Sequence, residues 1–516
     1  MPSLWGILRE DGILRDEACR RPVRLCREMR RKSTEENIMT DHKQAAIRYI
    51  EAHQDIFTAL SDEIWANPEL SLKEFHSAEA YRKVLRENGF TVESGMAGIE
   101  TAFLGRFGKG HPVIGILGEF DALSGLSQEK CAVEQKPLIP GGPGHGCGHN
   151  MLGTGALAAA FALKNYFEET GREGTVVFYG CPGEEGGAAK AFFARDRIWE
   201  SLDCALTWHP EDVNEVLSGT NNSSIQVLYN FKGIAAHAAG DPEHGRSALD
   251  AVELMNTGVQ YLREHMSSEC RVHYAITDAG GISPNVVQDH ASVLYMVRAN
   301  KVRDSVKLLA RVDKIAEGAA LMTETTFERV FIDGTAELLP NYALEEVLYK
   351  NFKEVGLPSY TEEELAFAEA LHKTCPENKT PGFAAALDGD MAAAAGKLSG
   401  NGSLAINNFL LPLFHTTGFR AGSTDVGDVS WQTPTAQVHC AAFVSGAPGH
   451  SWQNVSCGGS SIGHKALLQA GKVLACAAID LIEQPELLEE AKKEFKERSA
   501  AGYVCPIEPD AVPIAI

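Results

Sequence analysis

The pattern of hydrophobic and polar positions predicts alternating helices and strands along the first part of the chain. Apolar residues recur at the spacing of an amphipathic helix in three segments, which are 41–65, 78–87 and 153–167. Short, strongly apolar segments that suit buried strands lie at 101–107, 113–117 and 175–179. Alternation of this kind favours an α/β fold in which helices cover a mixed sheet.

The pattern changes near residue 222. A strand with alternating polar and apolar residues is expected at 225–231. A helix, two strands and a second helix are then expected at 247–264, 271–277, 292–298 and 304–321. This βαββα-like order predicts a separate inserted domain of the α+β, ferredoxin-like class. The surrounding domain is then discontinuous, because motifs with catalytic character resume after the insertion.

The expected organisation therefore has four parts. They are an N-terminal extension at 1–38, a main domain at 39–221 and 337–487, the inserted domain at 222–336, and a C-terminal helix and tail at 488–516. Residues 381–403 are rich in Ala and Gly and are expected to form a loop or a poorly ordered segment.

The extension at 1–38 is rich in Arg but also carries acidic residues, which argues against a targeting peptide. We expect it to be disordered or absent from the natural protein, with Met39 as the natural first residue. A genuine flexible arm is the alternative.

Composition narrows the class of protein. A chain of 516 residues exceeds one ordinary core, and its 44% hydrophobic and 22% charged residues are typical of a soluble globular protein. The net charge of −22 disfavours binding to nucleic acid or anionic lipid. No apolar run reaches the roughly 20 residues that a membrane span requires. The 12 cysteines lack regular spacing, so reduced thiols in the cytoplasm are expected.

Candidate chemistry begins with the segment GHGCGHN at 144–150. Cys147 and His149 are spaced so that both can face one cation, and the glycines allow a tight turn there. Zinc accepts both thiolate and imidazole ligands. Taken alone, however, a Cys-x-His pair is a weak signal, and a fortuitous loop explains it equally well.

Three further sites strengthen the metal hypothesis. Glu184 and Glu185 follow the apolar segment TVVFY, and adjacent carboxylates there can divide metal binding from proton transfer. His209 ends the segment CALTWH, and His450 follows AAFV. A solvated acidic loop and two core histidines are the alternatives. Because active sites in α/β sheets gather at strand ends, four such sites in one chain predict a metal centre.

These motifs, in this order, resemble the M20 family of metallopeptidases and amidohydrolases. The segments that carry the resemblance include GHGCGHN, FYGCPGEEGG, ALTWHPE, FKGIAAHAA, GGISPNVVQ and AGSTDVGDVSW, and it extends from about residue 41 to about residue 485. The Cys-Gly-His version of the first motif points to the aminoacylase, hippurate hydrolase and auxin-conjugate hydrolase branch. The resemblance implies a catalytic metallohydrolase domain interrupted by a lid that also forms a dimer.

The resemblance implies a specific metal centre. Two divalent ions, zinc or manganese, are expected on the side chains of Cys147, His149, Glu185, His209 and His450. Glu184 becomes the general base, which takes a proton from water and returns it to the leaving amine. Asp121 is expected to orient one of the ligands. In the peptidases of this family a metal-binding His often stands two residues before that Asp; Glu119 occupies the position here, and the Cys147/His149 pair is expected to compensate.

The resemblance also assigns roles in the inserted domain. His237 matches a lid histidine that reaches a neighbouring active site and stabilises the oxyanion. Asn285 and Arg298 match positions that contact the carboxylate of the substrate. Two alternatives stay open: Asn285 only shapes a turn, and Arg298 only makes a surface ion pair. Asp425 and Asp428 are expected either to line the site or to form a simple turn, and His145 and His415 are expected not to be ligands.

The expected function is therefore hydrolysis of the amide bond of an N-acyl amino acid, with p-aminobenzoyl-glutamate, cleaved to p-aminobenzoate and glutamate, as the first substrate to test. A dipeptidase or general aminoacylase with the same metals is one alternative. A non-catalytic partner of a paralogous hydrolase is another. A homodimer through the lid is expected, and a heteromer with a related A-type chain stays open.

Overall fold

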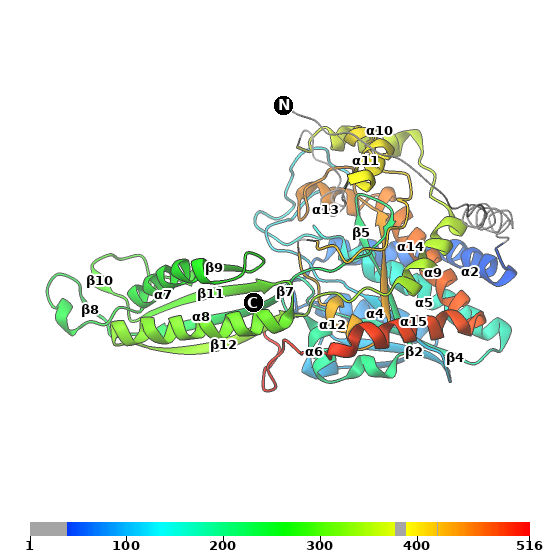
Figure 1. The fold of residues 1–516 in the computed structure, drawn as a ribbon. Helices are drawn as coiled ribbons and strands as arrows, with labels where there is room; N and C mark the ends of the chain where they lie inside the picture. Colours follow the sequence, from blue (N-terminus) through cyan, green and yellow to red (C-terminus); the bar gives the residue numbers. More distant parts are fainter. Residues whose placement is uncertain (1–38, 377–388, 421, 516) are drawn as a thin grey trace, which may run out of the picture. The chain divides into compact units, whose positions relative to one another are not determined.

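The computed structural model describes residues 39–376, 389–420 and 422–515 (Figure 1). The N-terminal extension at 1–38 lies outside the described residues, so the hypothesis that Met39 is the natural first residue stays a prediction. The same holds for the first part of the expected loop at 381–403. The expectation was wrong for residues 389–398, because helix α11 spans Gly389–Leu398. Alanine is the strongest helix former, and the run AAAA stabilises this short helix despite the flanking glycines.

A seven-stranded mixed sheet forms the centre of the larger part of the chain. Its strands lie in the order β1-β2-β4-β3-β5-β13-β6. Their bounds are Thr91–Ser94, Phe103–Lys109, Gly174–Gly180, Val113–Gly118, Cys204–Glu211, Thr435–Ala441 and Glu215–Val216. Strands β4, β3, β5 and β13 are parallel to one another, whereas β1, β2 and β6 pair antiparallel. The predicted α/β fold around a mixed sheet is confirmed.

Helices cover both faces of this sheet because alternate strand residues are apolar on both sides. In β4, Val176 and Phe178 belong to one hydrophobic cluster, whereas Val177 and Tyr179 belong to another. The first cluster includes helices α3, α4, α5, α9 and α14, which span Gln54–Ala66, Phe75–Glu87, His149–Thr170, Tyr342–Val355 and Ser461–Glu483. The second cluster includes α6, Ala189–Arg195. Such continuous apolar strands are expected where both faces are buried.

The N-terminal helical segment differs from its prediction. The helix expected at 41–65 is divided into α2, Asp41–Ala52, and α3. The break lies at His53, whose ring nitrogen Nδ1 lies 2.8 Å from the carbonyl oxygen of Tyr49. The apolar spacing continues across the break, so periodicity alone could not locate it.

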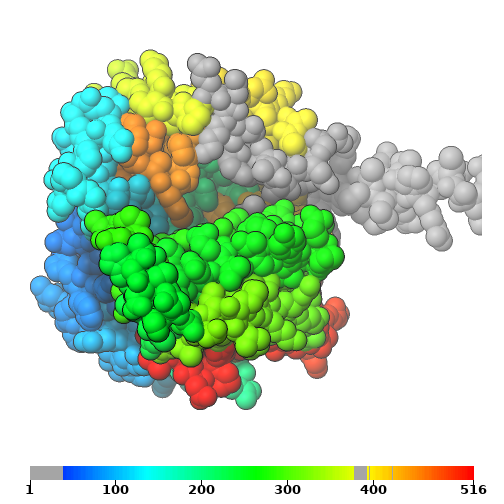
Figure 2. All heavy atoms as spheres, turned by 90° about the vertical axis from the view of Figure 1, so that its left-hand side faces the viewer, coloured from blue at the N-terminus to red at the C-terminus, as the bar shows by residue number. Residues whose placement is uncertain are grey.

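A second sheet is made entirely of residues from the predicted insertion. Strands β12, β7, β11 and β9 lie in that order and pair antiparallel, with bounds Thr326–Thr335, Ser223–Lys232, His290–Ala299 and Arg271–Asp278. Helices α7, Ala248–Leu262, and α8, Val302–Thr323, lie along one face of this sheet (Figure 1). Strand β12 was not predicted; it adds a final strand to the expected βαββα order. In Figure 2 the residues of this sheet and its helices, in green, form one contiguous surface.

The remaining elements complete the description. A two-stranded sheet pairs β8, Ala236–His237, with β10, Val286–Val287. Shorter or later helices are α10, α12, α13 and α15, at Glu362–His372, Val426–Ser430, Trp452–Gly458 and Pro485–Arg498. Among the described residues, none of the helices combines the length and the apolar character needed to cross a membrane.

Candidate metal centre

The predicted metal-binding motifs meet at one edge of the seven-stranded sheet. Glu119 and Asp121 follow the end of β3, Glu184 and Glu185 follow the end of β4, and His209 lies near the end of β5. Because these three strands are parallel, their carboxyl ends lie at the same edge. The turn that carries the Cys147 motif leads directly into α5, which begins at His149.

Three overlapping groups of metal-ligand atoms lie at this edge. They are Cys147, His149 and His209; Cys147, Glu185 and His450; and Glu119, His149 and Glu184, and within each group the ligand atoms lie within 4.8 Å of one another. The Cys147 Sγ atom lies 3.4 Å from His209 Nε2, and His450 Nε2 lies 3.4 Å from Glu185 Oε1. The fold thus brings all five predicted ligands together from sequence positions more than 300 residues apart.

Asp121 fixes the orientation of the His149 ring. Its Oδ1 atom lies 2.8 Å from His149 Nδ1, and its Oδ2 atom accepts hydrogen bonds from Ser71 Oγ and the Glu185 backbone N–H, both at 2.9 Å. Burial alone raises the pKa of Asp121, but the charge of His149 and these hydrogen bonds outweigh it and lower the pKa to about 2. Because Asp121 stays ionised and holds the Nδ1 atom of His149, the other ring nitrogen, Nε2, faces the ligand group. The same arrangement orients histidine ligands in many metal sites.

Several buried atoms at this edge have no hydrogen-bond partner among the described residues. They include His149 Nε2, Glu119 Oε2 and Glu185 Oε1. Burial, followed by the charges of Glu119 and Glu185, raises the pKa of Glu184 well above its ordinary value. Unpartnered acceptors and crowded carboxylates are costly unless a cation joins them. The thiolate, imidazole and carboxylate donors therefore fit divalent ions of the zinc type.

A cavity of about 600 Å³ adjoins the ligand groups. Beyond the predicted residues it is lined by Glu211, Glu215, Arg420 and His439, which were not predicted from the sequence. Glu215 Oε1 lies 2.8 Å from Arg420 Nη1 and 2.9 Å from His439 Nδ1. His439 on β13 lies opposite the predicted ligand His209 on β5. The cavity therefore extends from the predicted ligands across to the neighbouring strand. The register between distant strands could not be inferred from local motifs.

Asp425 and Asp428 take different positions. Asp425 Oδ1 lies 2.6 Å from the buried Lys190 Nζ, which lies 2.7 Å from Glu119 Oε1, so Asp425 joins the edge of the ligand groups through Lys190. Asp428 instead accepts hydrogen bonds from the backbone N–H of Ala336 and from the hydroxyl of Tyr503, at 3.0 and 2.6 Å.

The three residues predicted to act from a lid, His237, Asn285 and Arg298, lie outside the ligand groups found among the described residues. His237 is exposed on β8, and its Nδ1 atom accepts hydrogen bonds from the backbone N–H groups of Ala239 and Gly240. The carbonyl oxygen of Asn285 accepts a hydrogen bond from the Ala238 backbone at 3.0 Å, which supports the turn beside β10. Arg298 is half-buried on β11, and its Nε atom lies 3.0 Å from the sulfur of Met296.

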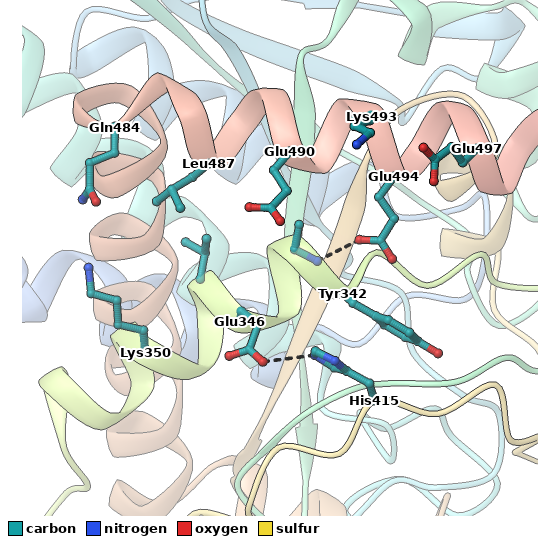
Figure 3. Close-up of a pocket in the computed structure, with 12 residues that line it drawn as sticks. Tyr342, Glu346, Lys350, His415, Gln484, Leu487, Glu490, Lys493, Glu494 and Glu497 are labelled. Carbon is teal, nitrogen blue, oxygen red and sulfur yellow. Dashed lines mark hydrogen bonds and ion pairs between the residues drawn. The ribbon is translucent and has the colours of Figure 1, made fainter. Parts of the chain in front are cut away.

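The two histidines expected not to be ligands contact other groups. His145 is buried, and its Nε2 atom lies 3.1 Å from the carbonyl oxygen of Ile64. His415 lines a separate hollow of about 520 Å³ between α9 and α15 (Figure 3). There its Nε2 atom lies 3.5 Å from Glu346 Oε1, and its ring stacks on Tyr342 with centroids 4.4 Å apart. This hollow holds none of the predicted ligands.

Comparison with known proteins places the chain in a family. The model of peptidase family M20/M25/M40 matches residues 115–394. The chain is 45% identical over 473 residues to the B-type component of p-aminobenzoyl-glutamate hydrolase from Escherichia coli (strain K12), covering 90% of this chain and 97% of that protein. It is 27% identical to the Xaa-Arg dipeptidase of Mus musculus, covering 88% and 92% of the two chains. It is also 29% identical to the A-type component of the same E. coli hydrolase, over 45% of this chain and 54% of that one.

Solved structures agree in fold. A putative aminohydrolase from methicillin-resistant Staphylococcus aureus has a TM-score of 0.57 at 16% identity, with 85% of this chain and 100% of that chain covered. An aminobenzoyl-glutamate utilization protein from Klebsiella pneumoniae has a TM-score of 0.54 at 15% identity, with 84% and 97% covered. The fold, the converging motifs and the sequence match over most of the chain lead to one assignment. The chain belongs to peptidase family M20/M25/M40 and is a metal-dependent hydrolase of amide bonds.

Proposed function

We propose that this chain hydrolyses the amide bond of an N-acyl amino acid, and that its substrate is p-aminobenzoyl-glutamate, cleaved to p-aminobenzoate and glutamate. The observation that carries the proposal is the convergence of five residues in overlapping ligand groups beside a cavity that Glu184 also lines; they are Cys147, His149, Glu185, His209 and His450. The 45% identity along 97% of the B-type component of the E. coli hydrolase supports the choice of substrate.

The proposed cofactors are two divalent ions per chain, held by the five predicted ligands. When bound, they supply Lewis acidity toward the scissile carbonyl and lower the pKa of a water molecule. Cys147 favours zinc, whereas the carboxylates are also compatible with manganese. The overlapping ligand groups share Cys147 and His149, which supports two neighbouring ions rather than one.

Glu184 is the proposed general base. It lines the cavity beside the ligand groups, and burial raises its pKa well above the ordinary value of a carboxyl group. A carboxylate beside the attacking water can accept a proton from it and return this proton to the leaving amine. It takes a proton from the attacking water as the new carbon–oxygen bond forms. It then delivers this proton to the amine as the carbon–nitrogen bond breaks, so that one water and one amide give one acid and one amine.

We propose that residues 222–336 form a lid and dimerisation domain, and that 39–221 with 337–487 form the catalytic domain. The separate sheet made of residues within 223–335 supports this division. Its edge strand β9 exposes Tyr274 and Ile276, each with 41% exposure, and unpaired edge strands are common sites of association. A homodimer through this edge is the proposed assembly. The alternative is a heteromer with a related chain, because one relative is the A-type component of the E. coli hydrolase.

In this assembly the lid residues act on the neighbouring catalytic domain. The exposed His237 donates a hydrogen bond to the oxyanion that forms at the scissile carbonyl. Arg298 and Asn285 contact the carboxylate of the substrate, and the fork of Arg298 suits two oxygens. We also propose a cytoplasmic location, because ten cysteines within the described residues are free thiols.

A dipeptidase is the second candidate function. The cavity carries Glu211 and Glu215, whose carboxylates suit a cationic substrate side chain, and the mouse relative is an Xaa-Arg dipeptidase. Arg420 lies within hydrogen-bond distance of Glu215 and reduces the negative charge of the cavity, which favours the acidic substrate.

The test is glutamate release from p-aminobenzoyl-glutamate by the purified chain alone, with zinc or manganese added. We expect cleavage that a chelator abolishes and that either metal restores, and much slower cleavage of a dipeptide ending in Arg. Preference for the dipeptide would favour the second candidate. A chain that neither binds metal nor cleaves either substrate, but becomes active with a related protein, would be the non-catalytic partner instead.

A further inference from the structure

We propose that Glu119 is an additional ligand of the ion held by His149, and that Lys190 is the positioning residue that aims it. This inference rests on the metal-dependent function proposed above and adds a ligand outside the five predicted ones. It is carried by the third ligand group, which joins Glu119, His149 and Glu184.

The geometry of Glu119 points to a cation. Glu119 directly follows β3 and is 2% exposed. Its Oε2 atom lies 3.3 Å from His149 Nε2, and both atoms are buried without a hydrogen-bond partner among the described residues. Asp121 already engages the other nitrogen of His149. With the proton on that nitrogen, Nε2 and Oε2 are two acceptors facing each other, and a cation between such atoms satisfies both.

Lys190 explains why Glu119 is held in this orientation. Its Nζ atom lies 2.7 Å from Glu119 Oε1 and 2.6 Å from Asp425 Oδ1, and both Lys190 and Asp425 are 0% exposed. Asp425 also accepts a hydrogen bond from the Lys190 backbone N–H at 2.9 Å. Lys190 therefore holds Oε1 and leaves Oε2 directed at His149. One ammonium against two carboxylates leaves a negative charge at the ligand group, which suits a divalent ion.

A second buried lysine, Lys43, also contacts two carboxylates but lies in a group with no predicted metal ligand. Lys43 Nζ lies 2.8 Å from Glu354 Oε2 and 2.7 Å from Asp480 Oδ2. The other oxygen of Glu354 lies 3.9 Å from Lys350 Nζ, so both oxygens of Glu354 face a lysine. Glu119 differs because its second oxygen faces an imidazole nitrogen instead. Glu354 is accordingly a matched control for Glu119.

The test compares metal binding in wild type, Glu119→Gln and Glu354→Gln. Zinc and manganese content are measured after dialysis, and affinity is measured by competition with a chromogenic chelator. The Gln side chain keeps the shape of Glu119 and leaves Lys190 paired with Asp425, so we expect the variant to fold. We expect Glu119→Gln to lose roughly tenfold to a hundredfold in affinity for one of two ions, a loss at least as large as that seen when groups around metal ligands are removed. Glu354→Gln should bind both ions as wild type does.

Lys190→Met provides the readout for positioning. We expect it to lower metal affinity in the same direction as Glu119→Gln but by less, because Glu119 stays present. Unchanged metal affinity in a folded Lys190→Met would overturn the positioning role. Asp425→Asn is the matched control: it weakens the other contact of Lys190 and leaves Glu119 held by Lys190, so we expect it to keep both ions bound.

The outcomes separate this inference from the proposed function. Two ions bound with equal affinity in wild type and Glu119→Gln would overturn the role of Glu119 while leaving the proposed function intact. An equal loss in Glu119→Gln and Glu354→Gln would show a general effect of removing a buried carboxylate, and would also overturn it. A wild-type chain that binds no zinc or manganese would contradict the proposed function and this inference together.

Discussion

At the scale of single residues, the metal centre depends on groups that orient ligands as much as on the ligands themselves. His149 is fixed because Asp121 engages its Nδ1 atom, and Asp121 is in turn fixed by Ser71 and the backbone of Glu185. This chain of contacts connects the ends of β3 and β4 to the start of α5. Orientation of the ring should therefore be the property most sensitive to substitution at Asp121.

Asp121→Asn is expected to reduce metal affinity by about 10- to 100-fold without unfolding the chain. The amide keeps the size of the carboxylate but cannot hold the Nδ1 proton of His149 as strongly. Affinity can be measured by chelator competition, and folding by circular dichroism. Ser71→Ala removes only one hydrogen bond to Asp121 and should cost much less. Unchanged metal affinity in Asp121→Asn would contradict the orienting role.

At the scale of secondary structure elements, the site is built by parallel strands that end together. The motifs at 144–150, 184–185 and 209 could be predicted because each one places its chemistry within a few consecutive residues. The parallel pairing of β3, β4 and β5 then brings these short segments to one edge. The mixed sheet and the helices α4, α5, α7 and α8 could likewise be predicted from local patterns, whereas α9 and α14, which complete the core beside α5, were not predicted.

Other features depend on contacts that no local pattern carries. Lys190 lies in an apolar segment, and only the fold shows that it joins Glu119 and Asp425. His439 meets Glu215 through the pairing of β13 with β6, two strands more than 200 residues apart in sequence. Arg420 reaches Glu215 from a segment that pairs with Thr220. Strand β12 was missed because its Glu, Arg and Asp residues interrupt the apolar alternation.

The pairing of β6 with β13 gives a prediction about acid stability. Burial raises the pKa of Glu215, but Arg420 and His439 outweigh it and lower the pKa to about 2, below its ordinary value of 4.5. A carboxyl group whose folded-state pKa is depressed stabilises the fold above its unfolded pKa, and this stability is lost as pH falls toward the folded value. The contribution at neutral pH is up to about 3 kcal/mol.

Glu215→Gln should therefore unfold more easily than wild type at pH 7, and the difference should narrow as pH falls below about 5. Chemical or thermal unfolding at pH 7, 5 and 4, with chelator present to remove metal effects, measures this difference. Exposed Glu497→Gln is a control that should show no such difference. A constant difference at all three pH values would mean that the lost stability comes from packing rather than from the charge of Glu215.

At the scale of the whole molecule, the proposed role of His237 in catalysis requires a second chain. Within the described chain, His237 is exposed and contacts the backbone of its own turn rather than the ligand groups. The exposed residues Tyr274 and Ile276 on β9 and Tyr261 on α7 give the lid an apolar edge. In the proposed homodimer, a second copy of the chain covers that edge and brings His237 to the neighbouring metal centre.

Mixing two inactive variants tests this assembly. His237→Ala and Glu184→Gln are each expected to lose nearly all activity. After the two are unfolded and refolded together at equal amounts, a dimer with one chain of each kind has one complete site, so about one quarter of wild-type activity should return. His244→Ala, which removes another exposed lid histidine, should be active by itself. Failure of the mixture to recover activity would contradict a homodimer that shares its active sites.

Glutamate release from p-aminobenzoyl-glutamate, measured together with metal content in wild type and Glu184→Gln, tests the central claim most directly. The substitution keeps the shape of the side chain and every predicted ligand, and it removes only the base. We expect both proteins to hold two ions per chain, and Glu184→Gln to lose at least about 100-fold in kcat, the range expected for general base catalysis. Wild-type turnover in a Glu184→Gln protein that keeps its metals would contradict the mechanism.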